Sequence, residues 1–233
     1  MLDIWMVGFL ILLALFLLYT IVPTVLIRGS GLGITKNIKK NSGIALTFDD
    51  GPNSEYTTRL LDLLKKYEVK ASFFVVGSKV KKNPEIIQRM HEEGHVIGIH
   101  HFHHVSSWVL SPFQLKKQLD MTEKAITECT KEKVIFYRPP WGHFNIFTPF
   151  LSKNYRVIMW SAIFGDWKVD NCKNNLLEQL RNTSTEGEII LLHDCGETLG
   201  ADKEAPLHMM ECLEIYLRGS KEKGTKFVTL RDI

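Results

Sequence analysis

The 233-residue sequence lacks several features that mark large classes of protein. Its four cysteines form no CxxC pair, which argues against a zinc site built from cysteines and against a disulfide-dense scaffold. Its formal net charge is only +3, too mild for the clustered basic face that binds nucleic acid, so no nucleic-acid partner is expected. It also contains no internal repeats and no low-complexity tracts. With 45% hydrophobic and 24% charged residues, the composition is that of one ordinary globular domain with room for an appendage.

Charged residues are also missing from the N-terminal stretch Ile4–Ile27, which lies between Asp3 and Arg28. A helix over this stretch is about 36 Å long at roughly 1.5 Å per residue, enough to cross a hydrocarbon core of about 30 Å. We therefore predict that residues 1–28 form an N-terminal membrane anchor with one transmembrane helix. A cleaved signal peptide is the alternative. Against it, no basic residue precedes the run, the run is too long for a signal sequence, and no A-x-A site follows it.

The flanking charges leave the orientation of this anchor open. Arg28 and three lysines follow the apolar run, and no basic residue precedes it. By the positive-inside tendency this pattern favours a cytoplasmic domain. Large domains often cross a membrane regardless of such charges, so the pattern decides little.

After the apolar run, residues 29–42 are predicted to form a flexible polar linker and residues 43–233 a single domain, in which β-rich apolar runs alternate with stretches of helical periodicity. The predicted strands cover Ile44–Phe48, Ala71–Val76, Val96–His100, Val134–Tyr137, Arg156–Trp160, Ile189–His193 and Phe227–Leu230. The predicted helices cover Tyr56–Tyr67, Pro84–Glu93, Ser111 to about Thr130, Asn174–Arg181 and Pro206–Arg218. This alternation indicates an α/β sheet or barrel of parallel strands with helices outside. Such folds place their chemistry on loops at the carboxyl ends of the strands.

Two adjacent carboxylates, Asp49 and Asp50, follow the first predicted strand. Burying them at a strand end is costly unless they are paired, hydrogen-bonded or bound to a metal. Because neighbouring side chains of an extended chain point in opposite directions, one can coordinate a metal while the other faces a substrate water. A solvated Asp-Asp-Gly-Pro turn is the other interpretation of these residues taken alone.

Four histidines lie within His100–His104, after the third predicted strand. His100 and His104 have the spacing that puts two imidazoles on one face of a helical turn, where they can grip one cation. Joined by Asp50, they would form an open three-ligand site with room for water, the arrangement of catalytic rather than structural zinc. A solvated histidine-rich loop is the alternative, and His101 and His103 are open to that interpretation.

Three further strand ends carry candidate residues. Arg138 and the backbone N–H of Trp141 lie in a turn made rigid by two prolines and a glycine, from which both could point into a site. Asp166 lies in an aromatic-rich stretch after the fifth predicted strand. His193 ends the next strand and could act as a general acid, although a lone histidine there is more often a satisfied polar group.

Taken in order, these blocks make the chain from about Gly43 to Ile233 resemble the polysaccharide deacetylase family, also called carbohydrate esterase family 4 or the NodB-homology domain. The blocks that carry the resemblance are Thr47-Phe48-Asp49-Asp50-Gly51-Pro52, Gly94-His95-Val96-Ile97-Gly98 with His100 and His104, Arg138-Pro139-Pro140-Trp141-Gly142, and Leu191-Leu192-His193. The resemblance implies a distorted (β/α) barrel of about seven parallel strands, here preceded by the transmembrane helix. It also implies hydrolysis of N-acetyl groups on a GlcNAc-containing polysaccharide such as peptidoglycan or a related envelope glycan.

Carried over position by position, the resemblance also implies a catalytic apparatus. Asp50, His100 and His104 would hold one divalent metal ion, expected to be zinc. Asp49 would be the general base, and His193 the general acid that protonates the leaving amine.

Three more residues would support this apparatus. Arg138 would hold Asp49, Asp166 would orient His193, and the backbone N–H of Trp141 would help to bind the oxyanion. Two positions depart from the usual family pattern. His101 stands where the family usually has Ser or Thr, and we expect it to compete for the metal. Ile163 stands where the family usually has Asp, and we expect it to make one wall of the groove apolar.

Two other functions fit the same sequence. One is an O-acetyl esterase on the same scaffold, and the other is a catalytically silent, membrane-tethered relative that only binds glycan. A metal-dependent phosphoesterase is disfavoured because no basic cluster near the site would clamp phosphate. A polymer substrate outside the cytoplasm implies an extracytoplasmic catalytic domain at the cell membrane, in conflict with the lysines that follow the apolar run.

Overall fold

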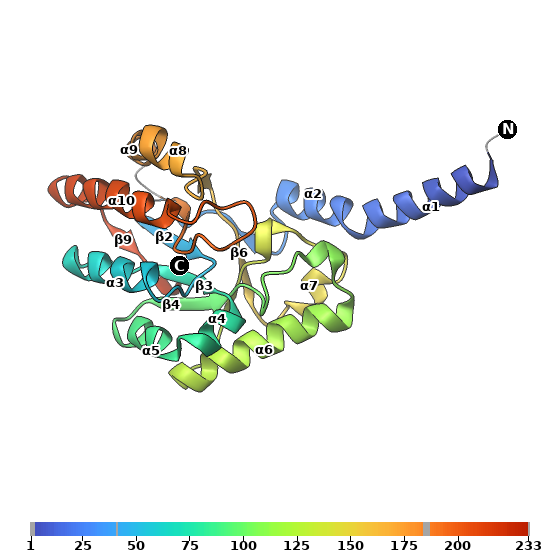
Figure 1. Cartoon of the computed structure of the whole chain (residues 1–233), viewed down its shortest axis with the longest axis horizontal. Coiled ribbons are helices and arrows are strands. Elements are labelled where there is room, and N and C mark those ends of the chain that lie inside the picture. Colours follow the sequence, from blue (N-terminus) through green and yellow to red (C-terminus); the bar gives the residue numbers. More distant parts are fainter. Residues whose placement is uncertain (1–2, 41, 184–186, 233) are drawn as a thin grey trace.

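The computed structural model describes residues 3–40, 42–183 and 187–232. Its strands form one nine-stranded sheet in which neighbours run parallel, in the order β1-β6-β5-β4-β3-β2-β8-β7, with β9 paired to β2 (Figure 1). The strands are β1 (Ile34–Thr35), β2 (Ile44–Asp49), β3 (Ser72–Val75), β4 (Val96–Ile99), β5 (Phe136–Tyr137), β6 (Arg156–Ile158), β7 (Ala162–Ile163), β8 (Ile189–His193) and β9 (Phe227–Val228). The predicted distorted barrel of parallel strands is confirmed. The two strands that the sequence did not predict, β1 and β7, are two residues long each.

Helices cover the outer side of the curled sheet (Figure 1). They are α3 (Tyr56–Lys66), α4 (Gly77–Lys82), α5 (Pro84–Glu92), α6 (Pro112–Thr130), α7 (Thr148–Leu151), α8 (Val169–Asn171), α9 (Leu177–Asn182) and α10 (Ala205–Glu222). Helix α3 illustrates why they pack there. Leu60, Leu61 and Leu64 form a fully buried stripe on one face of α3, while lysines at its C-terminal end stay in solvent. Each buried leucine stabilises this packing by about 1.5–3 kcal/mol.

The central strands β2 and β8 explain the position of the polar strand ends. Both are apolar runs that are buried almost throughout, as expected for parallel strands covered on both faces. Their register pairs Asp49 with His193 at the carboxyl end. Two residues far apart in the sequence are thereby held side by side by backbone hydrogen bonds.

The segment predicted as a flexible linker is part of the sheet. Strand β1 pairs with β6, and two residues after the end of β1 Asn37 forms an antiparallel bridge to Glu188, next to the start of β8. Ile38 is buried, and its N–H donates to the carbonyl of Gly187 over 3.0 Å. Isolated isoleucines among polar residues thus fix this segment across the opening between β6 and β8. Asn41 lies outside the described residues, and the boundaries of the domain stay a prediction.

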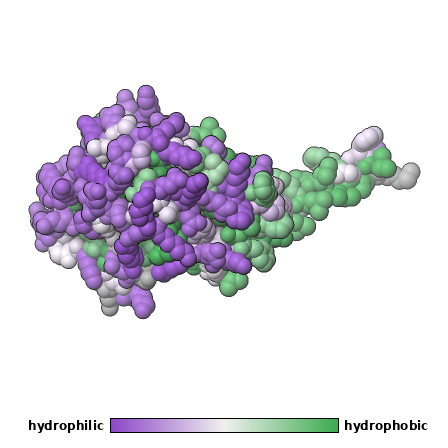
Figure 2. Space-filling view, turned by 90° about the horizontal axis from the view of Figure 1, so that it is seen from below, coloured by the Kyte–Doolittle hydropathy of each residue, from purple (hydrophilic) through white to green (hydrophobic). Residues whose placement is uncertain are grey.

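The N-terminal apolar stretch forms two consecutive helices, α1 (Ile4–Tyr19) and α2 (Ile21–Ser30), which together are long and apolar enough to cross a membrane. Helix α1 projects from the body of the protein, and its surface is apolar along most of its length (Figures 1 and 2). Helix α2 instead packs against the domain, where Thr20 and Thr24 are buried. Within the described part of the predicted anchor, α1 therefore has no buried residue, whereas α2 is held to the domain at Thr24.

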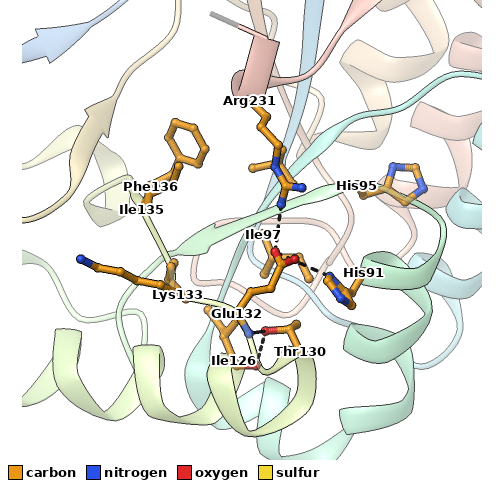
Figure 3. A pocket seen from close by; sticks show the side chains of 12 residues that line it. His91, His95, Ile97, Ile126, Thr130, Glu132, Lys133, Ile135, Phe136 and Arg231 are labelled. Carbon is orange, nitrogen blue, oxygen red and sulfur yellow. Dashed lines mark hydrogen bonds and ion pairs between the residues drawn. The ribbon is translucent and has the colours of Figure 1, made fainter.

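The amino ends of β4 and β5 enclose a hollow of about 340 Å³ (Figure 3). Glu132 lies at its centre, with its carboxylate 3.1 Å from the Arg231 guanidinium and 4.0 Å from the His91 ring. We call this the amino-end hollow. Glu132, Arg231 and His91 are partly exposed, and Glu132 lies within pairing distance of the other two.

Candidate active site

A cleft of about 370 Å³ opens at the carboxyl ends of the strands, at the opposite end of the sheet from the amino-end hollow. Most of the predicted site residues line it: Asp49, Asp50, His100, His104, Trp141 and His193. Its remaining walls are formed by Arg28, Trp160, Ile163, Trp167, Leu191 and the segment 198–201. Loops from distant parts of the sequence meet here because parallel strands bring all their carboxyl ends to one edge.

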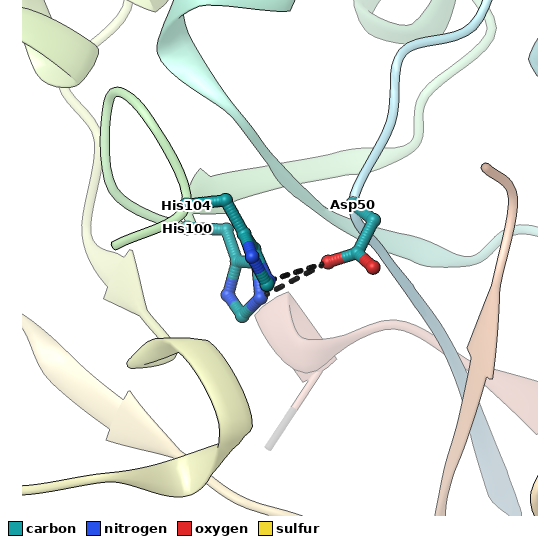
Figure 4. Close-up of side chains that lie close together, drawn as sticks. All are labelled: Asp50, His100 and His104. Carbon is teal, nitrogen blue, oxygen red and sulfur yellow. Dashed lines mark ion pairs between the residues drawn. The ribbon is translucent and has the colours of Figure 1, made fainter. Parts of the chain in front are cut away.

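Asp50, His100 and His104 converge on one point of this cleft (Figure 4). Oδ1 of Asp50 lies 2.9 Å from Nε2 of His104 and 3.4 Å from Nε2 of His100, and the three ligand atoms all lie within 4.8 Å of one another. Asp50 and His104 have left-handed backbones, with φ of 78° and 53°. These turns, just beyond β2 and β4, aim the two side chains at the same spot.

The local chemistry of this group fits a divalent cation. Nδ1–H of His100 donates to the carbonyl of Arg138 over 2.8 Å, which fixes the ring and leaves its Nε2 lone pair free toward Asp50. Oδ1 of Asp50 is buried and has no hydrogen bond of good geometry among the described residues. Two neutral imidazoles and one carboxylate in an open arrangement are a typical ligand set for catalytic zinc.

The environment also sets the charges of these ligands. Burial by itself raises the pKa of Asp50, but the contacts with His100 and His104 outweigh it and hold the pKa well below its usual value. Burial lowers the pKa of His104, partly opposed by Asp50, so the ring is neutral near pH 7. An ionised Asp50 beside a neutral His104 is the protonation state that metal binding requires of these two ligands.

Asp49 is buried next to this group and is held by Arg138. Its Oδ1 accepts a hydrogen bond of 2.6 Å from Nη1 of Arg138, and its Oδ2 lies 3.7 Å from Nε2 of His100. The guanidinium is fully buried and donates further bonds to Thr47 Oγ1 and to the carbonyls of Ile158 and Met159. Because every one of these partners is fixed by the sheet, one carboxylate oxygen of Asp49 is anchored and the other faces the cleft.

His193 lines the same cleft from the strand next to that of Asp49, and Asp166 holds its ring. Oδ1 of Asp166 is 3.0 Å from Nδ1 of His193, and Oδ2 accepts a 2.6 Å hydrogen bond from the His193 backbone N–H. Burial alone lowers the pKa of His193. The negative charge and hydrogen bond of Asp166, with smaller contributions from Asp50 and Asp49, reverse this effect and raise the pKa to about 10. The ring is therefore protonated near pH 7, with Nε2 as the nitrogen that Asp166 does not occupy.

Trp141 and Ile163 form two exposed walls of the cleft. Trp141 has a left-handed backbone, with φ of 55°, and its ring packs edge-on against His104 at a centroid distance of 4.3 Å. Ile163 lies at the end of β7 and makes its side of the cleft apolar, as the sequence suggested.

Two residues near the site have other partners. His101 is fully buried, its Nδ1–H donates to the carbonyl of Val105, and its Nε2 accepts from the Tyr137 hydroxyl. Both ring nitrogens are thereby used, so His101 does not compete for a metal. Cys195 is buried and accepts a 2.8 Å contact from Nζ of Lys79, and burial raises the pKa of its thiol to about 11. A thiol in this state is a poor nucleophile, consistent with a spectator role.

Sequence reasoning missed Arg28 as a residue of the cleft. It follows the apolar run and was interpreted only as a charge that flanks the membrane. In the structure it lines the cleft, with its guanidinium carbon 5.4 Å from the centroid of the Trp160 ring. The position of α2 against the domain brings it there, and no local pattern in the sequence signals that contact.

A parallel (β/α) barrel with an Asp-His-His cluster in the cleft at the carboxyl ends of its strands is an arrangement suited to a hydrolase. A family model described as polysaccharide deacetylase matches residues 36–156. The chain therefore belongs to the polysaccharide deacetylase family. It is an enzyme of that class, a hydrolase of carbon–nitrogen bonds other than peptide bonds.

Named relatives agree with this family. The chain is 34% identical over 199 residues to the peptidoglycan-N-acetylmuramic acid deacetylase PdaA of Bacillus subtilis (strain 168), covering 83% of this chain and 72% of that protein. It is 34% identical over 192 residues to a peptidoglycan-N-acetylglucosamine deacetylase of Bacillus cereus, covering 80% of this chain and 66% of that protein. The crystal structure of the Bc1960 peptidoglycan N-acetylglucosamine deacetylase superposes with a TM-score of 0.75 at 30% identity, covering 88% of this chain and 94% of that one.

Proposed function

We propose that this deacetylase is a membrane-anchored, divalent-metal-dependent enzyme that removes N-acetyl groups from a GlcNAc-containing glycan of the cell envelope. The observation that carries the proposal is the convergence of Asp50, His100 and His104 within 4.8 Å of one another. Asp49 lies beside this group, and His193 lines the same cleft. One cleft thus contains groups suited to hold a cation, accept a proton and donate a proton.

Asp49 is the general base of this proposal. Its free oxygen Oδ2 faces the cleft, while Arg138 holds Oδ1 and keeps the carboxylate in one orientation. It takes the proton from the water that attacks the acetyl carbon. General-base catalysis by a positioned side chain contributes about 10²–10⁴ to a rate.

His193 is the general acid. The leaving group of amide hydrolysis is an amine, which departs only when it is protonated. His193 carries a proton near pH 7 because Asp166 stabilises its charge, and it delivers that proton to the amide nitrogen as the carbon–nitrogen bond breaks. Water and the amide are thereby converted into acetic acid and a free amine, with one proton of the water on Asp49 and the proton from His193 on the amine. The acetic acid then ionises to acetate and releases its proton to solvent.

Asp50, His100 and His104 would hold the divalent cation, which when bound lowers the pKa of water and polarises the acetyl carbonyl. Nδ1–H of His100 is committed to the Arg138 carbonyl, so this ring keeps one tautomer and one orientation. The backbone N–H of Trp141 is proposed to donate to the negative charge that develops on the acetyl oxygen. Loss of such a donor typically costs about 10²–10³ in rate.

The substrate and the location follow from the relatives and from the N-terminal helix. The named relatives are peptidoglycan deacetylases, and an envelope glycan lies outside the cytoplasm. We therefore place the domain on the outer side of the membrane, with α1 as the anchor. The aromatic and apolar walls of the cleft, including Trp141 and Ile163, suit the faces of sugar rings.

Acetate release by the full chain in detergent tests this proposal. The substrates are purified peptidoglycan, N-acetylated chitooligosaccharides and O-acetylated oligosaccharides, each with and without a chelator followed by added zinc. We expect chelator-sensitive release from the N-acetylated substrates that zinc restores. Release from the O-acetylated substrates alone would make the protein an esterase, and no release from any of them would make it a glycan-binding relative.

A further inference from the structure

The two halves of the N-terminal apolar stretch have different surroundings. In α1 none of the residues Ile4–Tyr19 is buried. In α2, Thr24 lies in the interface with the domain. Its hydroxyl accepts hydrogen bonds from the Trp108 indole and the Phe144 N–H and lies 2.8 Å from the Phe144 carbonyl. Helix α2 is therefore held to the domain on the side of Thr24, while Val22, Val25 and Leu26 on the same helix stay exposed. Helix α1 is the part of the stretch with no buried residue.

The junction of the two helices is fixed to the domain at Tyr19. The Tyr19 hydroxyl donates to the carbonyl of Leu110 over 2.6 Å, and the Tyr19 carbonyl accepts from the Ile146 N–H over 3.1 Å. Nδ2 of Asn145 joins the same two loops through the carbonyls of Ser107 and Leu110. The base of α1 thus has a defined position on one face of the domain.

Exposed apolar side chains surround this base on the same loops and on the adjoining helices α6 and α7. We call them the apolar collar: Val109, Phe113, Ile146, Phe147 and Phe150. Phe113 is 78% exposed and Phe150 69% exposed. The Phe147 ring lies 6.1 Å from the Tyr19 ring, centroid to centroid. In Figure 2 the hydrophobic colour of the helix continues onto the adjoining part of the body, whereas most of the rest of that face is hydrophilic.

Helix α1 by itself is shorter than the hydrocarbon core of a bilayer. Its 16 residues give roughly 24 Å at about 1.5 Å per residue, which is less than a hydrocarbon core of about 30 Å. Trp5 and Tyr19 stand at its two ends, where aromatic residues of membrane proteins gather at the interfaces. Apolar side chains that enter the boundary region by about 5–10 Å would supply the missing apolar thickness.

We propose that the apolar collar is a membrane-contact surface that seats the domain directly on the bilayer around α1, and that the enzyme acts there on saccharides attached to membrane lipids. The proposal rests on the proposed anchoring by α1. The partner is the lipid bilayer itself, because the collar is continuous with the helix that enters it. Large contiguous apolar patches are rare on protein surfaces that face only water.

The position of the cleft gives the substrate class. Arg28 lies on α2 nine residues beyond Tyr19, which is about 14 Å along the helix axis, and it lines the catalytic cleft. A cleft at about 14 Å from the membrane end of α2 lies close to the first sugars of a glycan that is attached to a lipid of the same membrane. Confinement of enzyme and substrate to one surface raises their effective concentration.

Hydroxyl-radical footprinting of the full chain in lipid nanodiscs tests the collar without using activity. We expect Phe113 and Phe150 to be strongly protected from oxidation. The internal control is Ile135, an exposed apolar residue at the amino end of β5, which should stay reactive. Oxidation of Phe113 and Phe150 as fast as Ile135 would overturn the collar, while failure of the chain to elute with nanodiscs would refute the anchor instead.

A double variant, Phe113→Ser with Phe150→Ser, tests the substrate class, with Ile135→Ser as its matched control. The probes are an N-acetylglucosaminyl glycolipid in nanodiscs and water-soluble chitotetraose. We expect the double variant to keep turnover of chitotetraose and to lose turnover of the glycolipid by about tenfold. Equal loss on both substrates, or no loss on the glycolipid, would contradict the proposal, whereas an inactive wild type would refute the deacetylase assignment alone.

Discussion

Histidines and carboxylates gather at both ends of the sheet, but only the group at the carboxyl end is the one we propose to be catalytic. At the amino end, Glu132 faces His91 and Arg231 on a partly exposed surface (Figure 3). At the carboxyl end, Asp50 receives His100 and His104 at a buried point where no hydrogen bond satisfies its Oδ1 within the described structure. The same residue types therefore form an ordinary surface ion pair in one place and a buried group of candidate metal ligands in the other.

The two ends also differ in the pKa of a buried histidine, His95 at the amino end and His193 at the carboxyl end. At the amino end, burial lowers the pKa of His95 to about 4, and its Nδ1 accepts a hydrogen bond from the Ala71 N–H. At the carboxyl end, Asp166 overcomes burial and raises the pKa of His193 to about 10. Near pH 7 one imidazole is neutral and structural, and the other is a proton donor. Both rings have a carboxylate nearby, because Glu93 lies 3.7 Å from Nε2 of His95. Asp166 outweighs the effect of burial on the pKa of His193, whereas Glu93 does not outweigh it at His95.

The largest expected effect separates the base from the metal ligands. Replacing Asp49 by Asn removes the proton acceptor but keeps the shape and the hydrogen bond from Arg138. We expect acetate release to fall by about 10³-fold, because general-base catalysis is worth about 10²–10⁴. Bound metal, measured by elemental analysis of the same sample, should not change. Unchanged turnover in this variant would remove Asp49 from the proposed role.

A smaller effect is expected from Asp166→Asn, and it has a signature in pH. Without the negative charge, burial lowers the pKa of His193, and the protonated acid is lost at a lower pH. The alkaline limb of the pH–rate profile should therefore move to lower pH, and turnover at neutral pH should fall by about 10²-fold. If the alkaline limb does not move in this variant, the group that titrates there is not His193.

The smallest effect is expected at the amino-end hollow. Glu132→Gln removes its ion pairs with Arg231 and His91, whose side chains are partly exposed. Such pairs are worth about 0–1 kcal/mol. The free energy of unfolding, measured by chemical denaturation, should fall by less than about 1 kcal/mol, with acetate release unchanged. A loss of activity here would show that the comparison between the two ends is wrong.

The sequence allowed the sheet and the ligand group to be predicted for a physical reason. Long apolar runs such as β2 and β8 must be buried, and polar residues directly after them must meet at one edge. Asp49 and His193 were placed together by that argument. Their detailed roles, and those of Arg138 and Asp166, came from the resemblance and not from the pattern.

Other features could not be predicted, because they depend on contacts between distant segments. Strands β1 and β7 are too short to leave a pattern, and β1 exists because β6 offers it a free edge. Residues 34–38, which lie within the predicted linker, pair with the sheet for that reason. The contact of α2 with the domain depends on Thr24, which looks in the sequence like one more residue of a membrane span.

The measurement that tests the central claim most directly is the zinc content of the full chain after dialysis, compared among the wild type, His104→Ala and His91→Ala. The account predicts about one tightly bound zinc ion in the wild type and in His91→Ala, and loss of zinc and of acetate release together in His104→Ala. Retention of zinc by His104→Ala, or its loss in His91→Ala, would contradict the claim that Asp50, His100 and His104 form the metal centre.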